Sequence, residues 1–185
     1  HYDDLAEVLK KHCGFDATKW DRYTAGPKFI AHISQPLGGG ERGLAPFGDT
    51  HPNGNVFNFD PIGFARKYGA DVDVRELKTE ELPGFGVVFR NKPGTDDETF
   101  FAFKSGPSRG HYHGDQLAFH WCDKGRPLVV DHHCSYHPRA GQEHMHNRVA
   151  FGTRELPYAN MDGYERVIAF KTSESADVAI GQVSS

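Results

Sequence analysis

The sequence predicts a mainly β protein: an antiparallel β-sandwich preceded by a short α-helical tail and connector. Three observations lead to this prediction. An amphipathic segment opens the chain, a stretch rich in Gly, Pro, Asn and Asp follows it, and seven short β-like segments fill the second half. With 185 residues, 37% of them hydrophobic, the chain has the composition of a globular protein. We divide it into a helical tail with a long connector, 1–79, and a sandwich, 80–185.

The first part carries two helical patterns. Leu5, Val8 and Leu9 recur at helical spacing and Gly14 follows as a stop, which predicts a helix over 2–12. A second, short helix is predicted over 61–69. Between them, residues 23–59 have the composition of a loop.

The second part carries short apolar runs, several of them alternating with polar residues, which is typical of strands. The predicted strands cover residues 86–90, 99–104, 116–122, 127–131, 148–152, 164–171 and 177–183. The Asp-Lys-Gly-Arg sequence at 123–126 is a turn signal between two of them. Strands that follow one another across such short turns favour antiparallel pairing.

Charge and hydropathy exclude two classes of partner. The formal net charge is −4, so no broad cationic field indicates a nucleic-acid binder. No run of about 18 apolar residues is present, so no membrane-spanning helix is expected. The chain begins at His1 without a leader, and we expect it to be a fragment or a processed product. The spacing of Cys13, Cys122 and Cys134 indicates free thiols, not a disulfide framework.

Eight of the twelve histidines lie within residues 110–147. Each buried imidazole needs its own hydrogen-bond partners, so a core gains nothing from so many of them. The window contains His111-x-His113, an aspartate after a predicted strand (Asp131), and His144-x-His146. Two imidazoles and one carboxylate form a common zinc site, and other divalent metals accept the same donors. The alternative is that these histidines cap strands and bind to the backbone.

The stretch from SGPSRGHYHGD to EHMHNRVAFG, within residues 80–152, resembles the C-terminal sandwich of heparinase II/III-like polysaccharide lyases. The shared features are a Gly-His-x-His-x-Asp motif, a hairpin with Gly-x-Pro, an aspartate, a nearby tyrosine and a later His-Asn-x-Val. FGDTHPNG at 47–54 resembles the end of the helical domain of that family. The resemblance implies that the helical tail is the remnant of an α/α toroid and that the sandwich is truncated.

The resemblance also implies roles for individual residues. His111 matches the catalytic histidine of the family, and His113, Asp131 and His146 match its ligands to a structural zinc. Tyr136 resembles a tyrosine that faces the substrate, although a tyrosine that is only hydrogen-bonded at the end of a sheet is an equal alternative.

Residues around these motifs are further candidates. Arg109 and Arg139 flank the histidines and are expected to bind an anionic sugar, since guanidinium matches carboxylate and sulfate geometry. Arg90 and Arg148 are weaker candidates for the same cleft. Asp115 could orient an imidazole, or only cap a turn. Asn147 directly follows His146 and is counted with Asp115 as a supporting residue.

The implied reaction is β-elimination on a uronic-acid polysaccharide such as a glycosaminoglycan or alginate. A base removes the C5 proton while an acid protonates the departing O4, and histidine and tyrosine suit these steps. The resemblance implies a periplasmic or secreted protein and a helical domain outside these 185 residues. We expect the fragment alone to be inactive. The polysaccharide, endo or exo cleavage, C5 epimerisation instead of elimination, and the oligomeric state are left open.

Two alternatives remain from the sequence. His111-x-His113 and Pro138 to His144 loosely match the metal motifs of cupin barrels, which host oxygenases and isomerases, but Leu117 stands where a cupin has its glutamate. The other alternative is a carbohydrate-binding sandwich whose metal only stabilises the fold.

Overall fold

The computed structural model describes residues 2–48, 59–107, 115–130, 146–149 and 166–183. In chain order its elements are α1 (Tyr2–Cys13), η1 (Ala17–Lys19), α2 (Asp21–His32), β1 (Ser34–Gly38), β2 (Glu41–Leu44), α3 (Pro61–Lys67), η3 (Val74–Glu76), β3 (Glu80–Leu82), β4 (Gly86–Asn91), β5 (Thr99–Lys104), β6 (Phe119–Asp123), β7 (Arg126–Val129), β8 (Arg166–Lys171) and β9 (Val178–Gln182). The prediction of a mainly β protein with short helices is confirmed.

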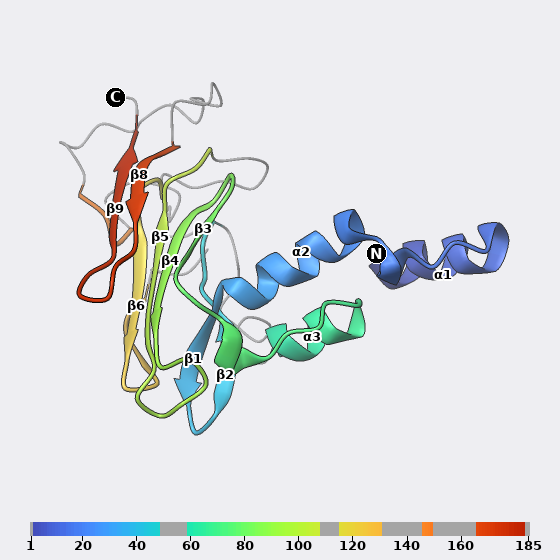
Figure 1. Cartoon of the computed structure of the whole chain (residues 1–185), viewed down its shortest axis with the longest axis horizontal. Helices are drawn as coiled ribbons and strands as arrows, with labels where there is room; N and C mark the ends of the chain where they lie inside the picture. Colours follow the sequence, from blue (N-terminus) through green and yellow to red (C-terminus); the bar gives the residue numbers. More distant parts are fainter. Residues whose placement is uncertain (1, 49–58, 108–114, 131–145, 150–165, 184–185) are drawn as a thin grey trace, which may run out of the picture.

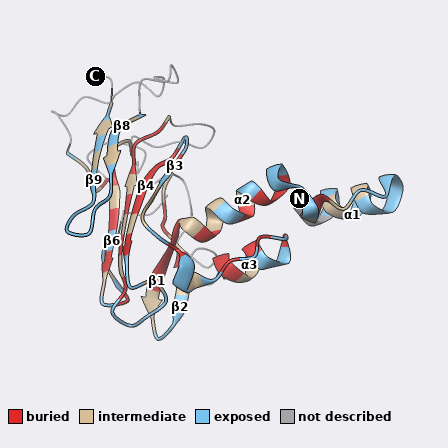
Figure 2. Cartoon of the chain, viewed as in Figure 1, coloured by how far each residue is buried: buried red, intermediate tan, exposed pale blue. Residues whose placement is uncertain are grey.

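A five-stranded antiparallel sheet of order β3-β4-β5-β6-β7 forms the centre of the molecule. The β1–β2 hairpin and the end of α2 lie on one side of it, and the β8–β9 hairpin lies on the other (Figure 1). The helices extend away from the sheet, and α1 is the farthest from it (Figure 1). Buried residues are concentrated in the central sheet, in β1 and in parts of α2 and α3 (Figure 2).

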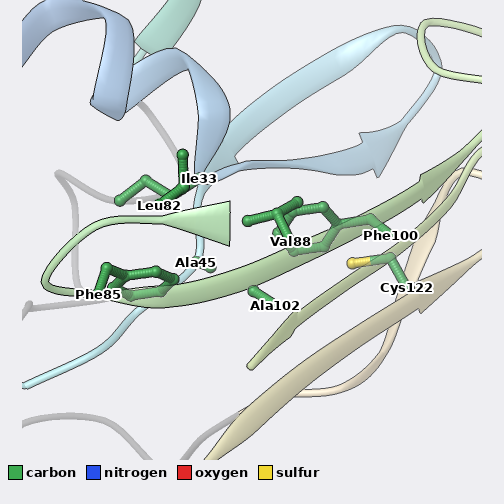
Figure 3. Close-up of a cluster of buried hydrophobic side chains, with 8 residues drawn as sticks. All are labelled: Ile33, Ala45, Leu82, Phe85, Val88, Phe100, Ala102 and Cys122. Carbon is green, nitrogen blue, oxygen red and sulfur yellow. The ribbon is translucent and has the colours of Figure 1, made fainter. Parts of the chain in front are cut away.

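Strand alternation decides which residues of the central sheet face the β1–β2 hairpin. The register sets Val88, Ala102 and His120 side by side, and Phe100 beside Cys122. These positions are buried, and Phe100 has no exposed surface. The resulting core consists of Ile33, Ala45, Leu82, Phe85, Val88, Phe100, Ala102 and Cys122 (Figure 3).

The opposite face of the central sheet is aromatic. The Phe101 and Phe119 rings stack at a centroid distance of 5.2 Å, and the Phe89 ring lies 6.4 Å from that of Phe170 in β8. The Ser105 hydroxyl donates a hydrogen bond of 2.8 Å to the Arg166 carbonyl. Aromatic contact and this hydrogen bond hold the β8–β9 hairpin against the sheet.

Both predicted helices are confirmed, as α1 and α3. Asp60 caps α3 by accepting hydrogen bonds from the backbone N–H groups of Ile62 and Gly63, and Pro61 occupies the first turn, where it needs no N–H partner. None of the described helices is long and apolar enough to cross a membrane.

The prediction of a loop over 23–59 was wrong for its first half, which forms most of α2 and the β1–β2 hairpin. Helix α2 contains Pro27, which disfavours helix, but packing of its buried face against neighbouring elements outweighs the local propensity. In the hairpin, the glycines that suggested a loop form the tight turn, where Gly38, Gly39 and Gly40 all have positive φ. The buried residues of the hairpin are Ser34, Gln35, Pro36 and Gly43, so no apolar alternation marked it as two strands.

Four of the seven predicted strands have their counterparts in β4 to β7, and the last two in β8 and β9. Of the strand predicted over 148–152, the described residues Arg148 and Val149 are not in a strand, and the others lie outside the described residues. The short β3 was missed, because three residues are too few for a visible alternation.

Candidate metal and catalytic site

Three of the predicted site residues, Asp115, His146 and Asn147, lie in the described part of the chain. The remaining ones lie outside the described residues: Arg109, His111, His113, Asp131, Tyr136 and Arg139. The candidate site is therefore described from Asp115, His146 and Asn147 and from the residues that contact them.

Asp115 is completely buried just before β6. Its carboxylate is paired with the ammonium group of Lys104, the last residue of β5, and accepts a 2.8 Å hydrogen bond from the backbone N–H of Gly48. Only 11% of the Lys104 side chain is exposed. A buried carboxylate needs such partners because its desolvation is costly. Asp115 thus links β5, the start of β6 and the backbone at Gly48.

The chain after the second His-x-His motif lies against the start of β6. The backbone N–H of Phe119 donates a 3.1 Å hydrogen bond to the Asn147 carbonyl. Asp115 is two residues after His113, and Asn147 directly follows His146. The fold therefore brings Asp115 and the His146–Asn147 segment to one end of the central sheet, although the two are far apart in sequence.

His146 is buried, with a relative exposure of 7%. Beside it in sequence, the Nδ2 atom of Asn147 is also buried and makes no hydrogen bond to a described residue. Within the described ranges, no three His, Cys, Asp or Glu side chains lie close enough together to hold a metal ion. Of the three expected zinc ligands, only His146 belongs to those ranges.

His120, for which the sequence indicated no role, lies in the core of β6. It has no exposed surface, and its ring meets that of Phe47 edge to face at 4.4 Å. Phe47 directly precedes Gly48, whose N–H binds Asp115. Residues 47–48 are thus held to the sheet by an aromatic contact and a hydrogen bond.

Arg90 was considered for an anionic-sugar cleft, and the structure corrects this. Its side chain is completely buried and donates a 2.6 Å hydrogen bond to Oε1 of Glu98, with further bonds to the carbonyls of His32 and Ser34. Its guanidinium also lies 4.5 Å from the Phe100 ring centroid. Arg90 holds the hairpin to the sheet and has no surface with which to meet a polysaccharide.

Glu98 is the centre of this buried network. Arg42 in β2 donates to both of its carboxylate oxygens, and Gly94 contributes a backbone N–H. Burial by itself would raise the pKa of Glu98, but the hydrogen bonds and charges of Arg42 and Arg90 outweigh it and hold the pKa below its ordinary value. Glu98 is therefore ionised at neutral pH.

The sequence carried a signal for both networks. Arg90 and Lys104 occupy the same strand face as the apolar residues Val88, Phe100 and Ala102. A charged residue at an inward position must find a buried partner. The alternation could thus have indicated buried pairs, but not that the partners are Glu98 and Asp115, which lie outside the strands.

Comparison with known proteins bears on the fold. No family model matches the chain, and no curated protein sequence matches it. A solved structure of a heparinase III gene product is similar to it, with a TM-score of 0.60 and 17% sequence identity. The similarity covers 83% of this chain and 27% of the heparinase III chain.

At that identity the similarity shows the fold alone. Most of this chain has a heparinase-like arrangement, and it spans about a quarter of the length of the heparinase III chain.

Proposed function

We propose that this chain is the sandwich part of a polysaccharide lyase that cleaves a uronic-acid polysaccharide by β-elimination. The observation that carries the proposal is the hydrogen bond from the Phe119 N–H to the Asn147 carbonyl, which brings the chain directly after the second His-x-His motif to the start of β6, close in sequence to Asp115. The heparinase-like fold supports it. A cupin barrel has no such support from the comparison, and the turnover experiment below distinguishes a lyase from a binding-only sandwich.

In this proposal His113, Asp131 and His146 hold a zinc ion or another divalent metal. The metal braces the segments at the end of the sheet. The burial of His146 supports its assignment, since a ligand to a structural metal is shielded from water. Asp115 and Asn147 do not bind the metal in this proposal. They stabilise the same end of the sheet, Asp115 through its contacts with Lys104 and Gly48.

The chemical work falls to His111 and Tyr136, with Arg109 and Arg139 binding the anionic sugar. Neutralisation of the C6 carboxylate acidifies the C5 proton, a base removes that proton, and the C4–O4 bond breaks as O4 is protonated. Histidine exchanges protons near neutral pH, and arginine binds carboxylate in a bidentate manner. We further propose that a helical domain of the same periplasmic or secreted protein completes the cleft.

Metal content tests the ligand set. The purified chain is expected to contain about one zinc per molecule by elemental mass spectrometry, and Asp131→Ala and His146→Ala are expected to lose it. His12→Ala, at the exposed end of α1, is the matched control and is expected to retain the metal. Retention of the metal by Asp131→Ala and its loss from His144→Ala would favour the cupin alternative.

Turnover tests the reaction. The chain is incubated with a panel of uronate polysaccharides, and the absorbance of the unsaturated product is followed. We expect turnover only when the helical domain is present, and His111→Ala in that longer protein should abolish it while leaving zinc bound. Unchanged turnover in His111→Ala would sink the assignment of His111.

A further inference from the structure

A hollow lies at the end of β5 that is opposite to Lys104 and Asp115. It has a volume of about 210 Å³, and the β1–β2 turn, the β4–β5 turn, the β6–β7 turn and η3 enclose it. Glu98, which lines this hollow, directly precedes β5, and β5 ends at Lys104. Six extended residues span about 20 Å, so the hollow is separate from the candidate metal site.

The hollow continues across β2. A neighbouring space of about 520 Å³ shares Gly40, Glu41, Arg42 and Val74 with it and reaches Phe59 near the start of α3. We call the two spaces together the β2 trough.

One wall of the β2 trough holds a donor that the fold has fixed in place. The Arg42 side chain is only 9% exposed, and its Nε donates to the Ser34 hydroxyl. Nη2 donates to the Ser34 carbonyl and to Oε1 of Glu98, and Nη1 donates to Oε2 of Glu98. These bonds engage four of the five N–H groups of a guanidinium. The remaining one, on Nη1, belongs to a side chain that lines the trough.

The rest of the charged lining is mainly acidic. Glu41, Asp73 and Asp96 line the 210 Å³ hollow, against Arg75 as the one further basic residue there. Carboxylates accept hydrogen bonds, whereas guanidinium donates them. A ligand with only hydrogen-bond donors would satisfy the carboxylates and not the guanidinium groups, and a ligand with only acceptors would do the reverse. Because acidic side chains outnumber basic ones in this lining, they repel the negative charge of uronate or sulfate groups.

Hydroxyl groups satisfy both sets, because each donates one hydrogen bond and accepts others. Val74 and Phe59 add apolar surface against which the C–H face of a sugar ring can pack. We propose that the β2 trough binds uncharged saccharide units. Such a site would anchor the protein to neutral sugar residues and does not depend on the histidines.

Binding is tested by NMR titration of the isotopically labelled 185-residue chain with uncharged oligosaccharides of glucose, mannose and galactose. We expect at least one of them to shift the backbone signals of Gly40, Glu41, Gly94 and Asp96. Glu41→Ala and Asp96→Ala should each weaken binding roughly tenfold, the effect of about 1.4 kcal/mol. Asp97→Ala is the matched control, because Asp97 is the next residue, is 68% exposed and does not line the trough.

Two results would overturn the proposal: no shift at these residues with any uncharged oligosaccharide, or tighter binding there of uronate oligosaccharides. Treatment with a chelator distinguishes the two sites. Saccharide binding in the β2 trough should persist after metal removal, so a failure of the proposed metal site and a failure of this one give different results.

Discussion

Asp115 and Lys104 form an ion pair inside the protein, where β5 ends and the chain approaches β6. The pair links β5 to the start of β6, and the bond from Gly48 to the same carboxylate extends the link to a third segment. Its environment differs from that of a surface pair, because water solvates neither charge well. We therefore expect each partner to depend strongly on the other.

Lys104→Met should destabilise the protein by about 3 to 5 kcal/mol, because it leaves the buried Asp115 carboxylate without its counter-charge. Adding Asp115→Asn should recover part of this loss, since the isosteric amide carries no charge. Urea unfolding followed by circular dichroism measures both. The control is Lys92→Met, which breaks the exposed pair with Asp97 and should change stability by less than about 1 kcal/mol. Equal effects at Lys104 and Lys92 would contradict the expectation.

The free energy of unfolding should fall in acid partly because the Glu98 carboxylate is protonated there. Glu98→Gln should remove most of that part of the pH dependence. Because the pKa of Glu98 is lowered in the folded protein, the carboxylate stabilises the fold above its unfolded-state pKa, about 4.3. That contribution is lost as the pH falls through the lowered, folded-state pKa. The variant should be less stable than the wild type at neutral pH, and the difference in unfolding free energy should become smaller in acid. Unfolding free energies between about pH 7 and pH 3 test this.

The control for that series is Glu174→Gln, since Glu174 is exposed in the β8–β9 connection. Its stability curve should follow that of the wild type. A constant difference between Glu98→Gln and the wild type at every pH would show that the charge of Glu98 is not what stabilises the network.

Cys122 should resist thiol reagents in the folded protein. It is fully buried against Gln35, and burial raises the pKa of its thiol to about 12, so the reactive thiolate is scarce. Cys13 is exposed and should react readily. In a Cys134→Ser background, a colorimetric thiol reagent should label one cysteine in buffer and a second only in denaturant. Fast labelling of Cys122 without denaturant would show that the core opens there.

Phe100→Ala should cost about 3 to 5 kcal/mol, because Phe100 is fully buried in the core drawn in Figure 3 and its removal leaves a cavity. Leu128→Ala, on the 56% exposed Leu128 of β7, should change stability by less than about 0.5 kcal/mol. Chemical denaturation of both variants compares them. A small loss of stability for Phe100→Ala would contradict this prediction and would mean that neighbouring side chains move to fill the cavity.

The sequence alone predicted the elements with regular apolar patterns. The short apolar runs in 86–90 and 99–104 correspond closely to β4 and β5, and the spacing of Leu5, Val8 and Leu9 corresponds to α1. Those patterns are local, because the period of the apolar residues follows directly from the geometry of a strand or a helix. The elements it missed, α2 and the β1–β2 hairpin, have a buried side that includes Pro27, Ser34 and Gln35, so their stability comes from distant partners and not from a local pattern.

The candidate site divides in the same way. The sequence alone identified the two His-x-His motifs and the residues expected to bind metal and substrate. Only the tertiary structure decided that Asp115 is neutralised by Lys104, that Arg90 is a buried partner of Glu98, and that the chain at Asn147 lies against β6. Each of these depends on which strands become neighbours. Strand neighbours are set by the burial of whole faces, a property of the assembled sheet that no single segment contains.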